Sequence, residues 1–372
     1  MVDLSDTPAV DGHCHPLLPD PRAISPERLL DLFSEGRPGT MRAHVPHTGY
    51  FHRALEHLGR RLGTAATVEA ILDRRRTGGG ELGRRALAES RVSRLLVDTG
   101  YPPEAMALDT MRATLACGIH EVFRIERCAE ALLARKLRFD RFLEAYRAEL
   151  TAAAGRAVAL KSIIAYRSGL AIRSWPVEQT AAAYRDTLER EVAAGSARLV
   201  EKPLLDTLLE VALEVCRATD RPLQLHAGFG DPDIDLLQSN PLLLRPVLED
   251  PRWAGVRLVV LHLAYPYFRE AAFMAAVWPQ VFVDLSLAIP YLGPAVAPPL
   301  TEVLSLAPSS KLLYGSDLGG LPELLAMSAD WARAALGESL GWLVDHDAMS
   351  TEEARRVGGQ ILSGNATELY GL

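Results

Sequence analysis

The sequence of 372 residues contains only four cysteines, and no two of them are spaced as a CxxC pair. This scarcity excludes disulfide-stabilised small domains and zinc ribbons, because both need several regularly spaced cysteines. Long apolar runs are missing as well, and none reaches the roughly 18 residues that a membrane helix needs. We therefore expect a cytoplasmic protein without a membrane span, whose thiols are free: Cys14, Cys117, Cys128 and Cys216.

An excess of positive charge is also absent. The sequence has 40 Lys and Arg residues against 47 Asp and Glu residues, which gives a formal net charge of −7. Nucleic acids and anionic membrane surfaces are therefore not expected as partners. Hydrophobic residues make up 48% of the chain and charged residues 23%, a composition typical of a globular protein with a large core. The expected partners are a small-molecule substrate and, in a homo-oligomer, further copies of the chain.

The sequence does contain a series of short apolar segments separated by helix-like stretches. Most of these segments alternate little between apolar and polar residues, as parallel strands covered on both faces do. Eight such strands that alternate with helices fit a (β/α)8 TIM barrel of the α/β class better than an open sheet. The predicted strands are residues 9–15, 94–99, 120–126, 157–165, 222–226, 257–262, 281–286 and 311–316.

Residues 16–93 are too many for one crossover between the first two strands, so they are predicted to form a helical insertion with helices at 25–34, 49–62 and 67–75. Because the insertion follows a strand, it belongs to the C-terminal face of the barrel and should cover the active site. The run Gly78-Gly79-Gly80 is interpreted as a hinge or turn. Residues 1–372 are predicted to be a single domain with C-terminal helices at 322–336, 351–362 and 365–372. The insertion is expected to supply substrate contacts, with His44, His47, His52 and His57 as candidates.

Residues suited to binding a metal occur at the ends of four predicted strands. The first strand ends in His13-Cys14-His15, and strand alternation places both imidazoles on one side while Cys14 faces away. His226, His262 and Asp317 end the fifth, sixth and eighth strands. In a barrel these ends converge on one rim, so the sequence predicts a metal site there.

Lys161 lies inside the apolar fourth strand, in Ala159-Leu160-Lys161-Ser162. A buried lysine costs free energy unless it is paired or chemically changed. One interpretation is an ion pair with a carboxylate. The other is a carbamate formed with carbon dioxide, whose anionic oxygens could bridge two divalent ions.

This order of residues resembles the amidohydrolase superfamily of metal-dependent hydrolases across all eight strands. The resemblance implies that His13, His15, His226 and Asp317 bind the metal. It makes Lys161 a carboxylated bridging ligand, and His262 either a ligand of a second metal or a catalytic group. One or two divalent ions are expected, with zinc the first choice. Water activated by the metal would then attack the substrate, and Asp317 would move the proton.

A narrower resemblance is to the amidohydrolase-like domains associated with glutamine-synthetase-like enzymes. It rests on Leu160-Lys161-Ser162-Ile163-Ile164-Ala165-Tyr166-Arg167-Ser168-Gly169-Leu170, on His226-Ala227-Gly228-Phe229-Gly230-Asp231 with Asn240-Pro241-Leu242, and on His262-Leu263-Ala264-Tyr265-Pro266. It implies hydrolysis of the amide bond of a small carboxylated substrate such as a γ-glutamyl amide, with a glutamine-synthetase-like ligase as a pathway partner. Arg167 could hold the substrate carboxylate in bidentate geometry, or it could form an interloop salt bridge.

Other catalytic classes fit the sequence less well. His120-Glu121-Val122-Phe123-Arg124 begins like the zincin motif HExxH but has arginine in place of the second histidine, and no GxSxG nucleophile elbow occurs. The main alternative is a metal-dependent decarboxylase of the same superfamily. A single metal ion and an unmodified Lys161 would favour this alternative. A non-catalytic binding protein is disfavoured because every ligand position is filled.

Overall fold

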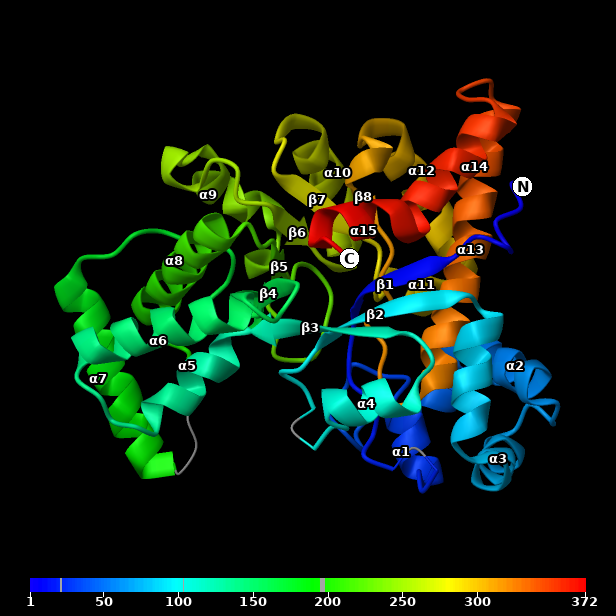
Figure 1. Cartoon of the computed structure of the whole chain (residues 1–372), viewed down its shortest axis with the longest axis horizontal. Coiled ribbons are helices and arrows are strands. Elements are labelled where there is room, and N and C mark those ends of the chain that lie inside the picture. Colours follow the sequence, from blue (N-terminus) through cyan, green and yellow to red (C-terminus); the bar gives the residue numbers. More distant parts are fainter. Residues whose placement is uncertain (21, 103, 195–197) are drawn as a thin grey trace. The chain divides into compact units, whose positions relative to one another are not determined.

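The computed structural model describes residues 1–20, 22–102, 104–194 and 198–372 (Figure 1). Its eight strands are arranged in the order β1 to β8, so neighbours in the sheet are also neighbours along the chain. The pairings β1–β2, β3–β4, β4–β5, β5–β6 and β6–β7 are parallel. The strands are β1 Ala9–Cys14, β2 Val92–Asp98, β3 Gly118–Arg124, β4 Ala159–Ser162, β5 Leu223–Leu225, β6 Leu258–Val260, β7 Val281–Asp284 and β8 Leu312–Leu313.

Backbone hydrogen bonds join the last strand to the first. The N–H of Gly12 donates to the carbonyl of Tyr314 over 2.9 Å, and the N–H of Asp317 donates to the carbonyl of His13 over 2.8 Å. A sequential parallel sheet that returns to its first strand, with helices between the strands, is a (β/α)8 barrel. The predicted fold class is therefore confirmed.

The eight predicted strands are all present, but most are shorter than expected. The fourth covers Ala159–Ser162 instead of 157–165, and the eighth covers only Leu312–Leu313 instead of 311–316. Asp317 has φ of 57°, which is incompatible with an extended strand. His15, His226, His262 and Asp317 thus lie just beyond the strands, whereas His13 and Lys161 lie within β1 and β4.

The chain forms two compact units. The first consists of residues 1–120, 230–232 and 284–372, and the second of residues 121–229 and 233–283. The chain crosses between these units inside β3 and β7, so neither unit carries the whole set of strands. The assignment of residues 1–372 to a single domain stays a prediction.

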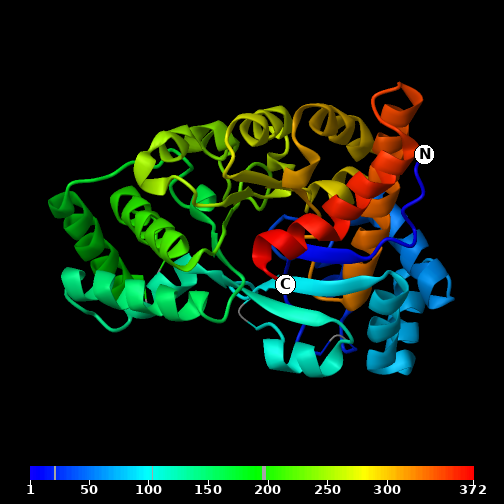
Figure 2. The same ribbon diagram turned by 45° about the horizontal axis from the view of Figure 1, so that its top comes forward.

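In the first unit, the segment between β1 and β2 is helical, as predicted. Ser25 and Thr67 cap helices that begin at the next residue, through hydrogen bonds from Arg28 N and Ala70 N. Helices α2 and α3 of this segment pack against the long helix α13 (Figure 2). The helices of this unit are α1 Pro26–Asp31, α2 Gly49–Leu62, α3 Val68–Glu89, α4 Leu108–Thr114, α11 Ala288–Leu292, α12 Ala297–Leu306, α13 Pro322–Asp345, α14 Thr351–Gly359 and α15 Asn365–Tyr370.

The run Gly78-Gly79-Gly80 lies within α3 and not in a loop. Gly79 has φ of 60° and ψ of −158°, a conformation open essentially to glycine alone, and it kinks the helix. The run is therefore a turn inside a helix, which agrees with the predicted hinge or turn. The helix predicted for residues 67–75 continues beyond this kink to Glu89.

The second unit holds α5 Ile125–Leu133, α6 Phe139–Ala154, α7 Val177–Ala194, α8 Lys202–Thr219, α9 Arg245–Glu249 and α10 Phe268–Val277. Helix α8 packs against α6 and α7, and α5 packs against α6. Short 3-10 helices occur in both units: Val45–His47, Ile164–Tyr166, Leu236–Gln238, Pro241–Leu244, Pro251–Trp253, His262–Ala264, Gly293–Val296 and Ser309–Lys311. A π-helical turn covers Gln360–Gly364.

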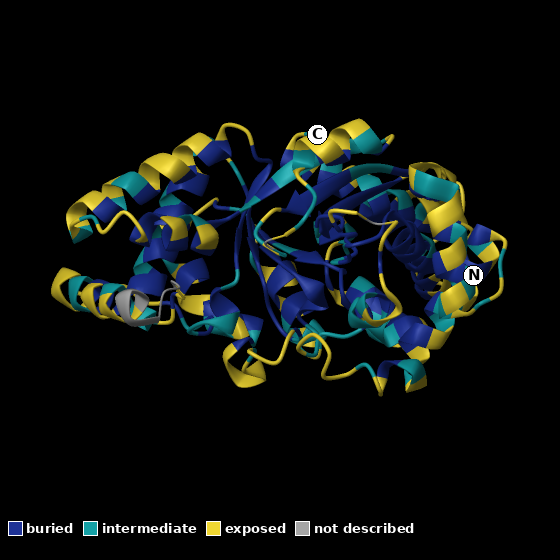
Figure 3. Ribbon diagram, turned by 90° about the horizontal axis from the view of Figure 1, so that it is seen from below, coloured by how far each residue is buried: buried dark blue, intermediate teal, exposed yellow. Residues whose placement is uncertain are grey.

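The strands are largely buried in each unit (Figure 3). All residues of β1, β4, β5 and β6 are buried, although these strands include charged and polar side chains such as Asp11, His13 and Lys161. Among the residues that the structure describes, no helix is long and apolar enough to cross a membrane.

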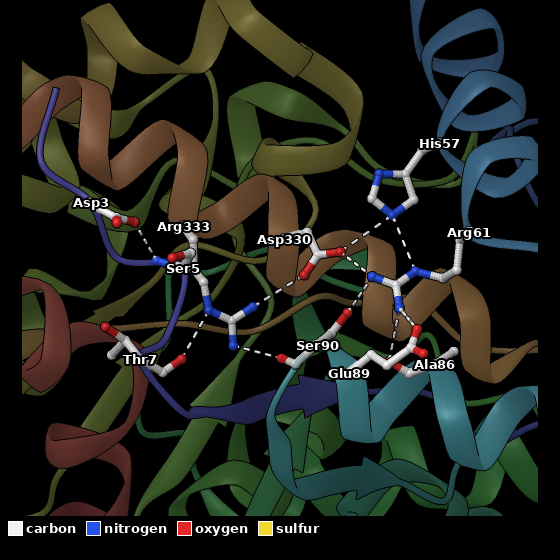
Figure 4. Close-up of polar contacts among 10 residues, drawn as sticks. All are labelled: Asp3, Ser5, Thr7, His57, Arg61, Ala86, Glu89, Ser90, Asp330 and Arg333. Atoms are coloured by element: carbon white, nitrogen blue, oxygen red, sulfur yellow. Dashed lines mark hydrogen bonds and ion pairs between the residues drawn. The ribbon is translucent and has the colours of Figure 1, made fainter.

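A polar network joins the N-terminal segment, α2, α3 and α13 within the first unit (Figure 4). Arg333 of α13 donates to the carbonyls of Thr7 and Ser90, and its neighbour Asp330 accepts a hydrogen bond from Arg61 of α2. Arg61 also donates to the hydroxyl of Ser90 over 2.7 Å. Because these groups lie at helix contacts partly shielded from water, the network fixes the insertion against α13.

Candidate metal centre

The ends of β1 and β8 are held together by the backbone. The carbonyl of His13 accepts hydrogen bonds from Ser316 N and Asp317 N, and His15 N donates to the carbonyl of Leu318 over 2.8 Å. A side chain at position 315 would clash, because its Cβ would lie 2.3 Å from a carboxylate oxygen of Asp284. Gly315 therefore permits the close approach that brings Asp317 to the HxH pair.

His13, His15 and Asp317 converge on one point. The Nε2 atoms of His13 and His15 lie 3.0 and 3.2 Å from the same Oδ1 atom of Asp317, and ligand atoms of the three side chains all lie within 4.8 Å of one another. The His13 side chain is inaccessible to solvent, whereas Asp317 is 11% exposed and His15 is 19% exposed. The sequence-based grouping of these three residues agrees with this geometry.

The donor set fits a divalent metal ion. Tetrahedral zinc with ligands at about 2.0–2.1 Å would hold its donor atoms about 3.3 Å apart, close to the separations found here. Two imidazole nitrogens and one carboxylate oxygen are donors that zinc accepts. The Nδ1 atom of His15 is buried without a hydrogen-bond partner, so this ring is not committed elsewhere through its second nitrogen.

Cys14 points away from these three side chains. Its thiol contacts the carbonyl of Leu96 on β2 at 3.5 Å, and burial raises its pKa well above the usual value for a thiol. A buried neutral thiol is a poor metal ligand. The alternation expected from the HxH spacing is therefore present.

The remaining predicted ligands lie in the second unit. Lys161 is 2% exposed on β4 and pairs in register with Arg124 of β3 and Gln224 of β5. The ring of His226, just after β5, lies 4.2 Å from the ring of Tyr166 and 4.5 Å from that of His262. The structure thus brings His226 and His262 together and buries Lys161 on the neighbouring strand.

The turn that carries His262 has an unusual backbone. His262, Leu263 and Ala264 have φ values of 65°, 55° and 46°, three consecutive non-glycine residues in the left-handed region. A Cβ at Gly228, in the loop that follows His226, would lie 2.3 Å from the carbonyl oxygen of Tyr265. Strain and close packing of this kind occur where a structure fixes functional side chains.

Arg167 lies after β4, as predicted, but one of its nitrogens is occupied. Its Nη2 atom lies 3.3 Å from Oε1 of Glu130, and the side chain is 11% exposed. Burial lowers the pKa of Arg167, while the charge of Glu130 opposes this effect. The Nη1 atom is buried and has no hydrogen-bond partner among the described residues. Of its two sequence interpretations, the salt bridge is therefore present, and the substrate role stays a proposal.

The candidate histidines of the insertion are dispersed. His44, His47 and His52 are exposed, whereas His57 is half-buried on α2 and lies 3.4 Å from Asp330 in the polar network (Figure 4). None of them belongs to the group formed by His13, His15 and Asp317. Their predicted substrate contacts remain untested.

Sequence reasoning missed an acidic side chain near this group. Glu35, in the loop after α1, accepts a hydrogen bond from the hydroxyl of Tyr291 over 3.0 Å. Burial, together with the negative charge of Asp317, raises the pKa of Glu35 to about 7. No sequence signal could have revealed it, because Glu35 and Tyr291 lie in loops or short helices without a motif.

Comparison with known proteins gives a consistent picture. The profile of the amidohydrolase family matches residues 125–372. Protein fluG of Emericella nidulans is 29% identical over 399 residues, which cover 98% of this chain and 46% of that protein. The chain thus spans about half the length of this curated relative.

Solved structures extend the likeness to the whole fold. A protein of Lactobacillus casei ATCC 334, described as a metal-dependent hydrolase, has a TM-score of 0.88 and 27% identity, with 100% of this chain and 98% of that chain covered. Uronate isomerase of Thermotoga maritima shares the fold at a TM-score of 0.69 and 15% identity, with coverage of 98% and 95%. Since the family profile covers well over half of its residues, this chain belongs to the amidohydrolase family of enzymes.

Proposed function

We propose that the protein is a metal-dependent hydrolase that cleaves the amide C–N bond of a small carboxylated substrate. The observation that carries this proposal is the convergence of His13 and His15 on one carboxylate oxygen of Asp317. The likeness to a metal-dependent hydrolase along the full chain supports it.

Zinc is the proposed metal, with His13, His15, His226 and Asp317 as its ligands. When bound, the ion supplies a polarised substrate carbonyl and an acidified water. His13 at the end of β1 and His15 just beyond it would hold the ion, and Asp317 lies close to the Nε2 atoms of both rings. Because nitrogen and carboxylate oxygen donors also suit other divalent ions, the metal content must be measured directly.

Three side chains are proposed to act on the substrate. Asp317 accepts a proton from the attacking water at a carboxylate oxygen and delivers it to the leaving nitrogen. His262 donates a hydrogen bond to the oxygen that becomes negatively charged as the carbonyl is attacked. The Nη1 atom of Arg167, which has no hydrogen-bond partner among the described residues, binds the substrate carboxylate while Nη2 stays with Glu130.

Lys161 is proposed to be carboxylated when two ions are bound. Its neutral Nζ attacks the carbon of carbon dioxide, an N–C bond forms while the π electron pair of one C=O bond moves to its oxygen, and the nitrogen releases a proton to water. The buried lysine amine is thereby converted to an anionic carbamate, which suits a site that holds cations. In this binuclear form His262 serves as a ligand of the second ion instead of a hydrogen-bond donor.

We expect Lys161→Ala to lose one of two metal ions and most of the activity. Labelling with ¹³C-bicarbonate should give a carbamate signal in the wild type that is absent from the variant, and elemental analysis gives the metal stoichiometry. Lys311→Ala, at a half-buried lysine outside this group, serves as the control. A single ion in the wild type without a carbamate signal would rule out the binuclear form and leave a mononuclear site.

The proposed substrate is a γ-glutamyl amide. The protein should release an amine from such compounds at a rate that depends on added zinc. Related barrels with the same ligand types can act as decarboxylases, so the assay should follow both amine and carbon dioxide. Carbon dioxide release without amine release would replace hydrolysis by decarboxylation.

A glutamine-synthetase-like ligase is proposed as a pathway partner, because such an enzyme makes the γ-glutamyl amides that this protein would cleave. The region that matches this chain forms 46% of protein fluG, so that relative contains further sequence outside the match.

A further inference from the structure

Glu35 stands near the candidate metal centre without a basic partner. It lies in the insertion between α1 and α2, and the hydroxyl of Tyr291 on α11 donates to its Oε1 atom over 3.0 Å. The side chain of Glu35 is only partly exposed, yet no lysine, arginine or histidine of the described residues forms an ion pair with it. A carboxylate removed from water normally has such a partner.

The negative charges around Glu35 favour the binding of a cation beside it. Burial is the main reason that its pKa is raised, and the negative charges of Asp317 and Asp231 add to this effect, while His15 opposes it. Glu35 is not one of the side chains whose ligand atoms lie within 4.8 Å of each other, so it stands beside the proposed metal ligands and does not belong to them.

A second, independent observation comes from Tyr50 of α2. Its ring lies 4.9 Å from the ring of Tyr291, and its side chain is buried with 6% exposure. Its hydroxyl has no hydrogen-bond partner among the described residues, and it lies close enough to Glu35 for that charge to raise the tyrosine pKa further. An unsatisfied buried hydroxyl costs free energy unless a ligand or water fills the position.

We propose that Glu35, Tyr50 and Tyr291 form a subsite that binds the ammonium group of the substrate. The carboxylate of Glu35 supplies the opposite charge, the hydroxyl of Tyr50 accepts a hydrogen bond, and the hydroxyl of Tyr291 holds the Glu35 carboxylate in place. This inference rests on the proposed function and narrows it, because it selects amides that carry a free amino group, as γ-glutamyl amides do, over amides of simple diacids.

The test compares paired compounds that differ only in the amino group. Wild-type protein should hydrolyse a γ-glutamyl amide with a kcat/KM roughly 10–100-fold higher than the matching glutaryl amide, the range expected for a hydrogen bond to a charged group. Glu35→Gln should remove most of this preference by lowering kcat/KM for the γ-glutamyl amide. Glu56→Gln, an exposed glutamate of α2, should keep it.

Binding provides a measurement that does not depend on turnover. By calorimetry on the metal-loaded protein, L-glutamate should bind more tightly than glutarate, and Tyr50→Phe should narrow the difference. If neither amide is hydrolysed while L-glutamate is still preferred, the proposed reaction is wrong but the subsite stands. If the wild type treats both members of each pair equally, or Glu35→Gln leaves the preference intact, the ammonium subsite is wrong.

Discussion

Glu126 is a buried carboxyl that links the start of α5 to the end of β4. Its Oε1 atom accepts hydrogen bonds from the Ser162 hydroxyl at 2.5 Å and from Ile163 N at 3.0 Å. Burial raises its pKa above the usual glutamate value, although both hydrogen bonds oppose the shift. The folded protein therefore binds a proton more tightly at this position than the unfolded chain does.

The sign of the pH dependence follows from this difference. The contribution of Glu126 to stability is fully present below the ordinary glutamate pKa, and it is lost as the pH rises toward the raised pKa of the folded state. The loss is at most about 1.4 kcal/mol per pH unit for one group. Glu126→Gln keeps the acceptor oxygen and removes the titration, so its urea-unfolding free energy should fall less than that of the wild type between pH 5 and pH 8. Parallel pH profiles for the two proteins would contradict this account.

Residues on strand ends were accessible to prediction, whereas residues on loops were not. His13 and His15 follow from strand alternation, and Asp317 follows from the position of the last strand, so local patterns were sufficient. Glu35 and Tyr291 meet across 256 positions of the sequence, and neither has a motif around it. Arg167 could be placed after β4, but its pairing with Glu130 is a contact that one sequence cannot reveal.

At the scale of the elements, the predicted strands and helices are present with shifted ends. The helix predicted for 49–62 is found as α2 with the same bounds. The helix predicted for 67–75 instead continues to Glu89, because α3 packs against α13 and this contact outweighs the low helix propensity of three glycines. Helix α4 lies between β2 and β3, where a helix was expected without stated bounds, because Leu108–Thr114 is only seven residues long.

The kink in α3 gives a prediction with an internal control. A Cβ at Gly79 or at Gly80 would meet no atom within 4 Å, but only Gly79 has a positive φ. Gly79→Ala should therefore lower the free energy of unfolding by about 1–3 kcal/mol through backbone strain alone. Gly80→Ala should instead raise it by up to about 1 kcal/mol, because alanine favours the helix. Thermal unfolding of both variants provides the comparison, and equal effects would show that the kink is not needed in solution.

At the scale of the whole molecule, the barrel was predictable because eight apolar segments alternate with helix-like stretches along the sequence. The division into two compact units was not, because it depends on the density of contacts that no local pattern encodes. The polar network around Asp330 and Arg333 could not be predicted from the sequence either, because it joins four segments that are distant along the chain (Figure 4). The family profile matches residues 125–372, which do not include His13 and His15. The role of these two histidines is therefore tested by a separate experiment.

The metal content of the purified protein tests the central claim most directly. After incubation with zinc and removal of free ions, elemental analysis should find at least one zinc ion per wild-type chain. His13→Ala should contain far less zinc while its circular dichroism stays that of a folded barrel, and His52→Ala, at an exposed histidine of α2, should match the wild type. A wild type without bound metal, or a folded His13→Ala variant with full occupancy, would contradict the account.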